Sequence, residues 1–248
     1  MSYDPALVWA FLTALIAGVT RGFSGFGGAL IFVPLVSAAF GPKVAAPTLL
    51  VIDTVLTLPF LLRALRACLW RQVAPLAVGA VVAVPAGVWV LEHMEPLVLR
   101  WALAVLSLGL LALLMSGWRH SGRHGLPTTL GVGAIAGFCG GAAQMSGPAV
   151  VVYWLGAGQP SALVRANLFG FFALVTLASG TAYAAHGMID AEVGRLSLLL
   201  GPAYALGLYA GARSFKGASD KAYRIAAYWV IAGAALFSLP LFDALLGR

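Results

Sequence analysis

The chain is short of charged residues and has almost no cysteine. Only 9% of its 248 residues are charged, against roughly 25% in soluble domains, so its composition lies far outside the globular norm. The two cysteines, Cys68 and Cys139, are far apart and lie in apolar sequence. They indicate neither a disulfide framework nor a metal site.

Several motifs of catalysis and ligand binding are missing as well. The chain has no ATP-binding motif, no HExxH pattern and no Ser/His or Asp/Asp pairing, so we expect no enzyme activity and no cofactor. His120 and His124 have metal-like spacing, but they lie in a glycine-containing linker without a third ligand, so no metal is expected. The net charge of +7 does not predict nucleic-acid binding, because the basic residues form short clusters between apolar spans.

Apolar residues, in contrast, are abundant. They make up 61% of the chain, the mean hydropathy is +0.96, and residues 73–91 run for 19 positions without a charge. About 20 such residues form a helix that crosses the roughly 30 Å hydrocarbon core of a bilayer. The composition therefore predicts an all-α polytopic membrane protein.

Two glycine-rich stretches with a common pattern interrupt the apolar sequence. Six residues between positions 16 and 33 have identical counterparts at an offset of 119, and each stretch leads into a Gly/Pro turn. Paired interruptions in corresponding halves are a sequence indicator of a transporter's binding site. We therefore predict a first repeat at residues 1–117, a cytoplasmic linker at 118–126 and a second repeat at 127–248.

Each repeat is predicted to contain one broken segment and three full spans. The broken segments are residues 6–40 and 127–157. The first holds 35 residues, too many for one span and too few for two spans and a turn. Two half-length helices that meet at a glycine loop fit this number. The full spans are expected near residues 44–62, 72–91, 97–117, 163–185, 193–212 and 221–239.

Basic residues predict the topology. They form three clusters: Arg63, Arg66 and Arg71; Arg119 and Arg123; and Arg213, Lys216, Lys221 and Arg224. The positive-inside rule places all three clusters in the cytoplasm. This requires the second broken segment to return to the side that it entered, as a re-entrant hairpin. The same reading of the first segment gives inverted repeats with both termini outside, an architecture of many secondary transporters.

The glycine loops themselves predict a site for a small anion. A half-helix that begins inside the membrane presents free backbone N–H groups and the positive end of its dipole, and two opposed helix starts would point at one centre. The glycines concerned are Gly25, Gly27, Gly28 and Gly147. The alternative for these glycines is close helix packing alone.

Arg21 and Asp53 are charged residues predicted to lie at membrane depth, where a charge is costly and indicates a functional role. As a planar, always-charged donor, Arg21 suits an oxyanion; alternatively it extends to the interface or pairs with a carboxylate. Asp53 is the one acidic residue in the interior of a predicted full-length span. It could carry a coupling proton, bind Na⁺ or neutralise Arg21.

Five further polar side chains complete the predicted substrate-binding set. Ser24, Gln144 and Ser146 lie inside the breaks, and Arg165 and Asn167 open the helix that follows the second break. Hydroxyl, amide and guanidinium groups all donate hydrogen bonds to an oxyanion. For Arg165, the alternative is that it merely marks the cytoplasmic face.

The two breaks, each followed by a short helix and a Gly/Pro turn, resemble the sulfite exporter TauE/SafE family of bacterial membrane proteins over nearly the whole chain. The resemblance implies a protein of the bacterial cytoplasmic (inner) membrane that exports sulfite, sulfoacetate or a related organosulfonate. The chain departs from the family's usual run of glycines at Gln144 and Ser146.

Together these features predict a secondary transporter, acting as an exporter, that carries a small anion by alternating access. An anion channel and a transporter of a small non-sulfur carboxylate remain as alternatives. The expected partners are the anion, the lipid bilayer and a coupling H⁺ or Na⁺, and a homodimer is left open.

Overall fold

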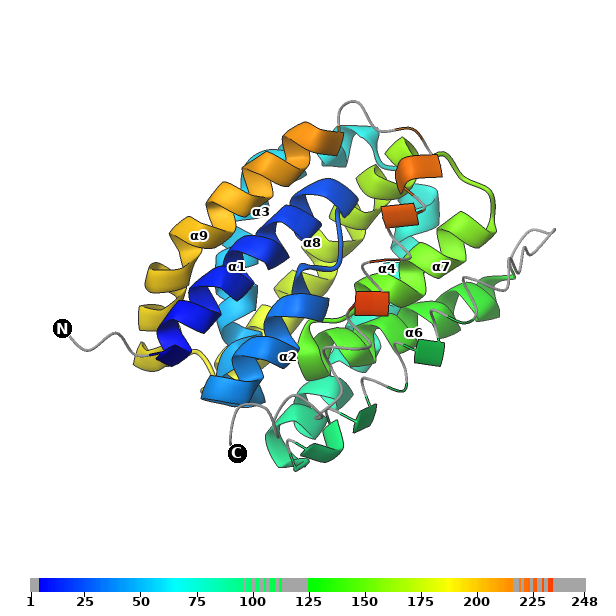
Figure 1. Cartoon of the computed structure of the whole chain (residues 1–248). Coiled ribbons are helices and arrows are strands. Elements are labelled where there is room, and N and C mark those ends of the chain that lie inside the picture. The colour runs from blue at the N-terminus through cyan, green and yellow to red at the C-terminus, as the bar shows by residue number, and fades with distance from the viewer. Residues whose placement is uncertain are drawn as a thin grey trace.

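The protein is a bundle of helices, and the prediction of an all-α polytopic membrane protein is confirmed (Figure 1). The computed structural model describes residues 5–95 and 125–215, and parts of 97–112 and 219–233. Within these residues, six helices are long and apolar enough to cross a membrane. The described helices are α1 (Pro5–Ser24), α2 (Gly28–Phe40), α3 (Pro42–Ala67), α4 (Trp70–His93), α6 (Leu126–Ala143), α7 (Gly147–Gly156), α8 (Ser161–Ala185) and α9 (Ala191–Phe215). The spans predicted at 97–117 and 221–239, and the linker with His120 and His124, fall wholly or largely outside the described residues.

Both broken segments differ from the prediction of two half-length helices. The first helices are too long for it: α1 has 20 residues and α6 has 18, which at 1.5 Å per residue is about 30 Å and about 27 Å. The second helices, α2 and α7, have 13 and 10 residues and are too short to cross a bilayer. In the first segment, α1 continues through Arg21 and ends only at the following glycine turn.

The two short helices lie inside the bundle. All but four residues of α2 and two of α7 are buried, and their long neighbours cover them. Because backbone that is not paired within a helix is tolerated at membrane depth only where protein or a watery cavity surrounds it, this burial explains how the chain can break at both positions.

Glycines bring two pairs of long helices into backbone contact. Along α1 and α9, a methyl group added at Gly22 would overlap the Leu208 carbonyl, and one added at Gly211 would overlap the Val19 carbonyl. Along α4 and α6, one added at Gly137 would overlap the Ala80 backbone. Small residues at such positions allow helices to pack closely in membranes. Each close pair joins one helix from each predicted half, and α1 and α9 lie side by side in Figure 1.

The corresponding helices α3 and α8 run in opposite directions. Leu50 lies opposite Gly180, whereas Phe60, further along α3, stacks on Phe169, nearer the start of α8. An inverted repeat requires this antiparallel relation. The repeats and their boundaries themselves stay a prediction.

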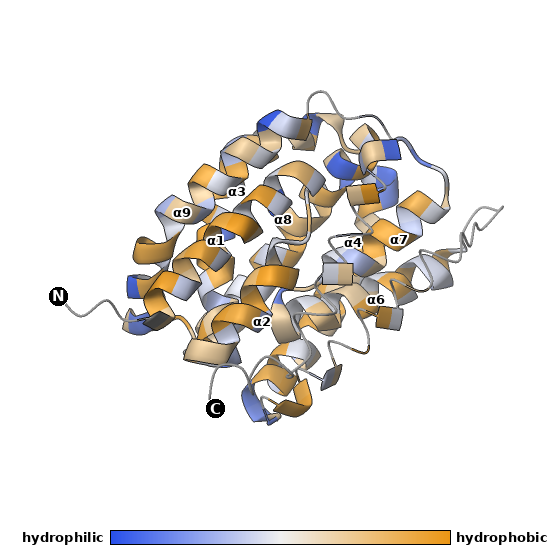
Figure 2. Ribbon diagram, in the orientation of Figure 1, coloured by the Kyte–Doolittle hydropathy of each residue, from blue (hydrophilic) through white to orange (hydrophobic). Residues whose placement is uncertain are grey.

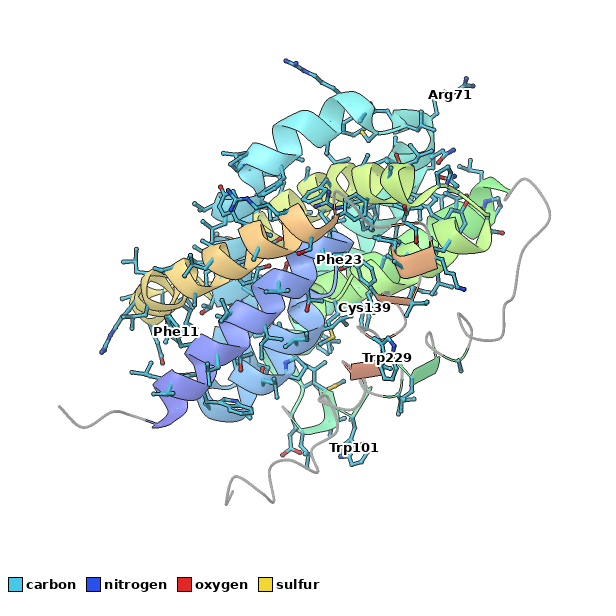
Figure 3. All side chains as sticks on the ribbon, turned by 45° about the horizontal axis from the view of Figure 1, so that its top comes forward. Phe11, Phe23, Arg71, Trp101, Cys139 and Trp229 are labelled. Atoms are coloured by element: carbon cyan, nitrogen blue, oxygen red, sulfur yellow. The ribbon has the colours of Figure 1, made fainter. Side chains whose placement is uncertain are left out.

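The outer faces of the long helices carry apolar side chains. Val82 is 77% exposed and Leu198 is 81% exposed, and hydrophobic residues cover most of each helix in Figure 2. Phe11 projects outward in Figure 3, whereas Cys139 lies in the interior. Apolar surface of this extent is expected to face lipid.

Cysteine labelling tests the predicted topology. In a variant without Cys68 and Cys139, Lys43→Cys and Pro160→Cys are each expected to react with a membrane-impermeant thiol reagent from one face only, and from opposite faces. Both positions are exposed, so access to the reagent is set by the side of the membrane. Labelling of both from the same face would contradict the inverted hairpin topology.

Candidate functional site

The first break is a glycine turn closed by a serine. Gly25 and Gly27 have φ angles of 78° and 88°, in the left-handed region that favours glycine. The Ser24 hydroxyl lies within hydrogen-bonding distance of the Thr20 carbonyl and the Phe26 carbonyl, and it also faces the Phe26 N–H at 3.3 Å. Ser24 is fully buried. Its hydroxyl therefore holds the turn.

The second break turns at Gln144, a residue with a φ angle of 58°. Its side-chain amide donates to the Gly140 carbonyl at 3.1 Å and lies 3.4 Å from the Tyr183 hydroxyl. The hydroxyl of Tyr183 in turn donates to the Gly141 carbonyl at 2.8 Å. These bonds stabilise a left-handed conformation that is uncommon for a residue other than glycine. Ser146 is the N-cap residue of α7, but its side chain makes no capping bond.

The two breaks meet at one small cavity. Phe26 of the first break packs against Gly147 of the second, where an added methyl group would lie 2.9 Å from the Phe26 Cβ. The cavity has a volume of about 40 Å³, room for roughly three water molecules. Its lining combines both breaks with Arg21, Asp53 and Tyr204, and includes Gly27, Gly28, Gln144, Gly147 and Phe172. The N-termini of α2 and α7 thus reach the same space.

Arg21 and Asp53 form an ion pair at this cavity. The Arg21 Nε and Nη2 atoms lie 2.9 Å and 2.8 Å from the two Asp53 carboxylate oxygens, and the side chains are 6% and 19% exposed. Tyr204 donates to the same carboxylate at 2.7 Å, and the Arg21 Nη1 donates to the Gly25 carbonyl. The sequence left open whether the two charges pair, and the structure brings them together.

The ion pair leaves some N–H donors of the Arg21 guanidinium group unused. Its five N–H donors make one bond from each nitrogen, to Asp53 and Gly25, so two N–H groups remain. The Phe172 ring packs 4.6 Å from the guanidinium carbon, a cation–π distance that fixes the group in place. Arg21 lines the cavity and keeps donors for a ligand.

Comparison with known proteins identifies the family. A family model described as "Sulfite exporter TauE/SafE" matches residues 10–238. The chain belongs to this family. No curated protein and no solved structure matches it. The TauE/SafE match supports an anion-exporter type of membrane transporter, and thereby the resemblance that the two breaks indicate.

Five predicted residues of this TauE/SafE protein are not in the lining of the cavity: Ser24, Gly25, Ser146, Arg165 and Asn167. The Asn167 amide accepts from the Leu69 N–H at 2.8 Å and donates to Gln72 at 3.2 Å. It therefore caps the start of α4 and joins it to α8. Arg165 donates to the Gly22 carbonyl at 2.7 Å, in the last turn of α1. Arg165 thus touches the break but does not line the cavity with Arg21.

On α8 and α9, three cavity residues of the TauE/SafE chain were not predicted from the sequence. Tyr204, Phe172 and Thr176 line the cavity, and each lies in a long apolar helix where aromatic or hydroxyl residues are common packing residues. No spacing or motif distinguishes them. The one available signal is that Asp53 needs a buried partner besides Arg21, which Tyr204 supplies.

Proposed function

We propose that this protein is a secondary transporter, acting as an exporter, of a small anion such as sulfite, sulfoacetate or another organosulfonate. The observation that carries the proposal is the single cavity lined by both breaks, with Arg21 in its wall. Helix N-termini and an arginine with free N–H groups are the donors that bind oxyanions in proteins. The cavity volume of about 40 Å³ suits a compact head group.

Alternating access would move the helices around this cavity. The glycine contacts make α1 with α9, and α4 with α6, two closely packed units. Between α3 and α8 lies a larger hollow of about 460 Å³ that shares Arg21, Asp53 and Phe172 with the cavity. Units that each keep their internal contacts can rock about the less densely packed α3–α8 contact. The short helices α2 and α7 would form re-entrant hairpins that move with their units.

The carboxylate of Asp53 is the proposed point of coupling. A substrate anion that approaches Arg21 competes with this carboxylate, and the competition is relieved when Asp53 takes up a proton or binds Na⁺. In a bacterial cytoplasmic membrane, the inside-negative potential also drives anion export, by about 2.3 kcal/mol per charge per 100 mV. The potential term favours export over uptake wherever the transported complex keeps a net negative charge.

Asp53→Asn is expected to remove the dependence of transport on pH or Na⁺. The amide is not ionisable and carries no charge to compete for Arg21, so anion binding should become tighter and insensitive to these ions. Binding and initial rates measured at several pH values and Na⁺ concentrations check this. Thr54→Ser, on the same helix and beside the same hollow, is a control. Retention of the dependence in Asp53→Asn would exclude Asp53 as the coupling residue.

A binding screen tests the proposed function as a whole. Purified protein is titrated with sulfite, sulfate, thiosulfate, sulfoacetate and acetate, with thermal shift and calorimetry as readouts. We expect saturable binding of at least one sulfur oxyanion or organosulfonate and weaker binding of acetate. Tighter binding of acetate would favour the alternative of a carboxylate transporter, and binding of none of the five anions would contradict the proposal.

A further inference from the structure

A second arginine-lined hollow lies at one end of the bundle, among α3, α8 and α9. Its volume is about 440 Å³, and it is distinct from the central cavity. The aromatic part of its lining comes from Phe60, Phe169, Tyr209 and Phe215, and its cationic part from Arg165 and Arg213. Arg213 closes α9 at the end that the basic clusters assign to the cytoplasm.

The guanidinium of Arg165 is held in place from several sides. Its Nη2 donates to the Gly22 carbonyl at 2.7 Å, its carbon lies 4.3 Å from the Phe215 ring centre and 5.5 Å from that of Phe169, and its side-chain stem packs against Gly25. Carbonyl and ring faces are neutral partners, and none of these contacts cancels the positive charge.

Arg165 differs from Arg21 in having no carboxylate. Across the described part of the chain, no acidic group lies within ion-pair distance of it, whereas Arg21 has Asp53. The Arg165 Nε is buried and has no hydrogen-bond partner. A partly buried charge without an oppositely charged partner is costly, and an anion that enters the hollow would offset that charge.

We propose that this hollow is a cytoplasmic-side acquisition site for the transported anion, with Arg165 as its principal cation and Arg213 at its rim. The inference rests on the proposed function. The ligand class is a small organosulfonate: the charged head group would meet the two guanidinium groups, and a short apolar body would contact the aromatic rings. A guanidinium can bind such an oxyanion by two parallel hydrogen bonds.

The hollow adjoins the spaces around Arg21, with which it shares a lining residue. Phe169 lines both this hollow and the one between α3 and α8. Arg21 in turn lines both the α3–α8 hollow and the central cavity. The Arg21 guanidinium carbon also lies 5.2 Å from the centre of the Phe169 ring. Arg213, Arg165 and Arg21 thus line successive spaces, and an anion captured at Arg165 would pass next to Arg21.

Transport by the Arg165→Gln variant, measured with the anion presented on one face of the membrane at a time, tests the inference. Ethanesulfonate transport is measured in everted and in right-side-out membrane vesicles. We expect the variant to raise the half-saturating concentration about tenfold when the anion is presented on the cytoplasmic face, with the maximal rate and the value for the opposite face little changed. Arg165→Lys, which keeps the charge, should show a smaller rise. Arg195→Gln, an exposed arginine at the other end of α9, is the matched control and should resemble the wild type.

A second variant and a binding measurement keep the inference testable. Should Arg165→Gln fail to fold, the exposed Arg213→Gln is expected to give a rise of about twofold to threefold on the cytoplasmic face. An unchanged half-saturating concentration, or an equal rise on both faces, would overturn the inference.

Ethanesulfonate binding by purified protein in neutral detergent with a zwitterionic lipid should also weaken in Arg165→Gln. An effect seen only with an anionic lipid would assign the hollow to a lipid head group and overturn the inference. Wild-type vesicles without saturable anion transport would overturn the proposed function together with this inference, whereas wild-type transport with no effect of the variants would overturn this inference alone.

Discussion

Arg21→Gln is expected to abolish measurable binding and transport of the anion. The substitution removes the charge and the two N–H donors that remain after Arg21 bonds to Asp53 and Gly25. Hydrogen bonds to a charged group contribute about 1.5–3 kcal/mol each, so the loss of both should weaken binding at least about 100-fold. Isothermal titration and vesicle transport with the best anion of the binding screen measure the effect.

The same substitution also leaves the Asp53 carboxylate without its cation. Breaking a buried ion pair on one side costs about 3–5 kcal/mol of stability, and this loss could by itself remove activity. The double variant Arg21→Gln/Asp53→Asn is therefore the decisive control, because it removes both charges and should recover most of the thermal stability. We expect it to remain unable to bind the anion. Wild-type affinity in the stable double variant would show that the pair is structural only.

Gly137→Ala is expected to have the second large effect, a loss of stability of about 3 kcal/mol or failure to fold. The added methyl group would overlap the backbone of Ala80, which cannot move as a flexible side chain can, and inserting atoms into a packed interface costs typically 1–3 kcal/mol even where side chains adapt. Melting of the detergent-purified protein, followed by size-exclusion chromatography, measures the change.

Gly131→Ala is the matched control for this prediction. Gly131 lies on the same helix, α6, but an added methyl group would meet no atom within 4 Å. Alanine has a higher helix propensity than glycine by about 1 kcal/mol, so this variant should be as stable as the wild type or more so. Equal stability of the two variants would contradict the close α4–α6 packing and, with it, the rigid units of the proposed transport cycle.

Much of the fold could be predicted because its signals are local. Hydrophobic length and basic clusters indicate spans, and glycine positions indicate the two breaks. The length of α1 could not be predicted in this way. A lone charge near a run of glycines favours an early break, but Arg21 is neutralised by Asp53, 32 residues further on, and the helix therefore continues past it. Whether a buried charge has a partner is a tertiary property.

The same distinction applies to the site. Arg21 and Asp53 stand out in the sequence because charges at membrane depth are rare and expensive. Asn167 stands out equally as a polar residue, yet its amide caps α4, since a buried amide serves a backbone N–H as readily as a ligand. Tyr204 carries no signal, although its hydroxyl completes the hydrogen bonding of Asp53. The type and spacing of residues in the sequence identify unusual side chains. Their hydrogen-bond and ion-pair partners are known only once helices that are distant in sequence are packed together.

Substrate counterflow in proteoliposomes tests whether the protein has one anion site that is reached alternately from the two sides of the membrane. Liposomes loaded with unlabelled sulfonate are diluted into labelled sulfonate at zero membrane potential, and uptake is followed over time. We expect saturable uptake that internal substrate accelerates, in the wild type but not in Arg21→Gln/Asp53→Asn. Uptake that does not saturate and is carried by large unitary currents, whatever the internal substrate, would contradict alternating access and indicate an anion channel.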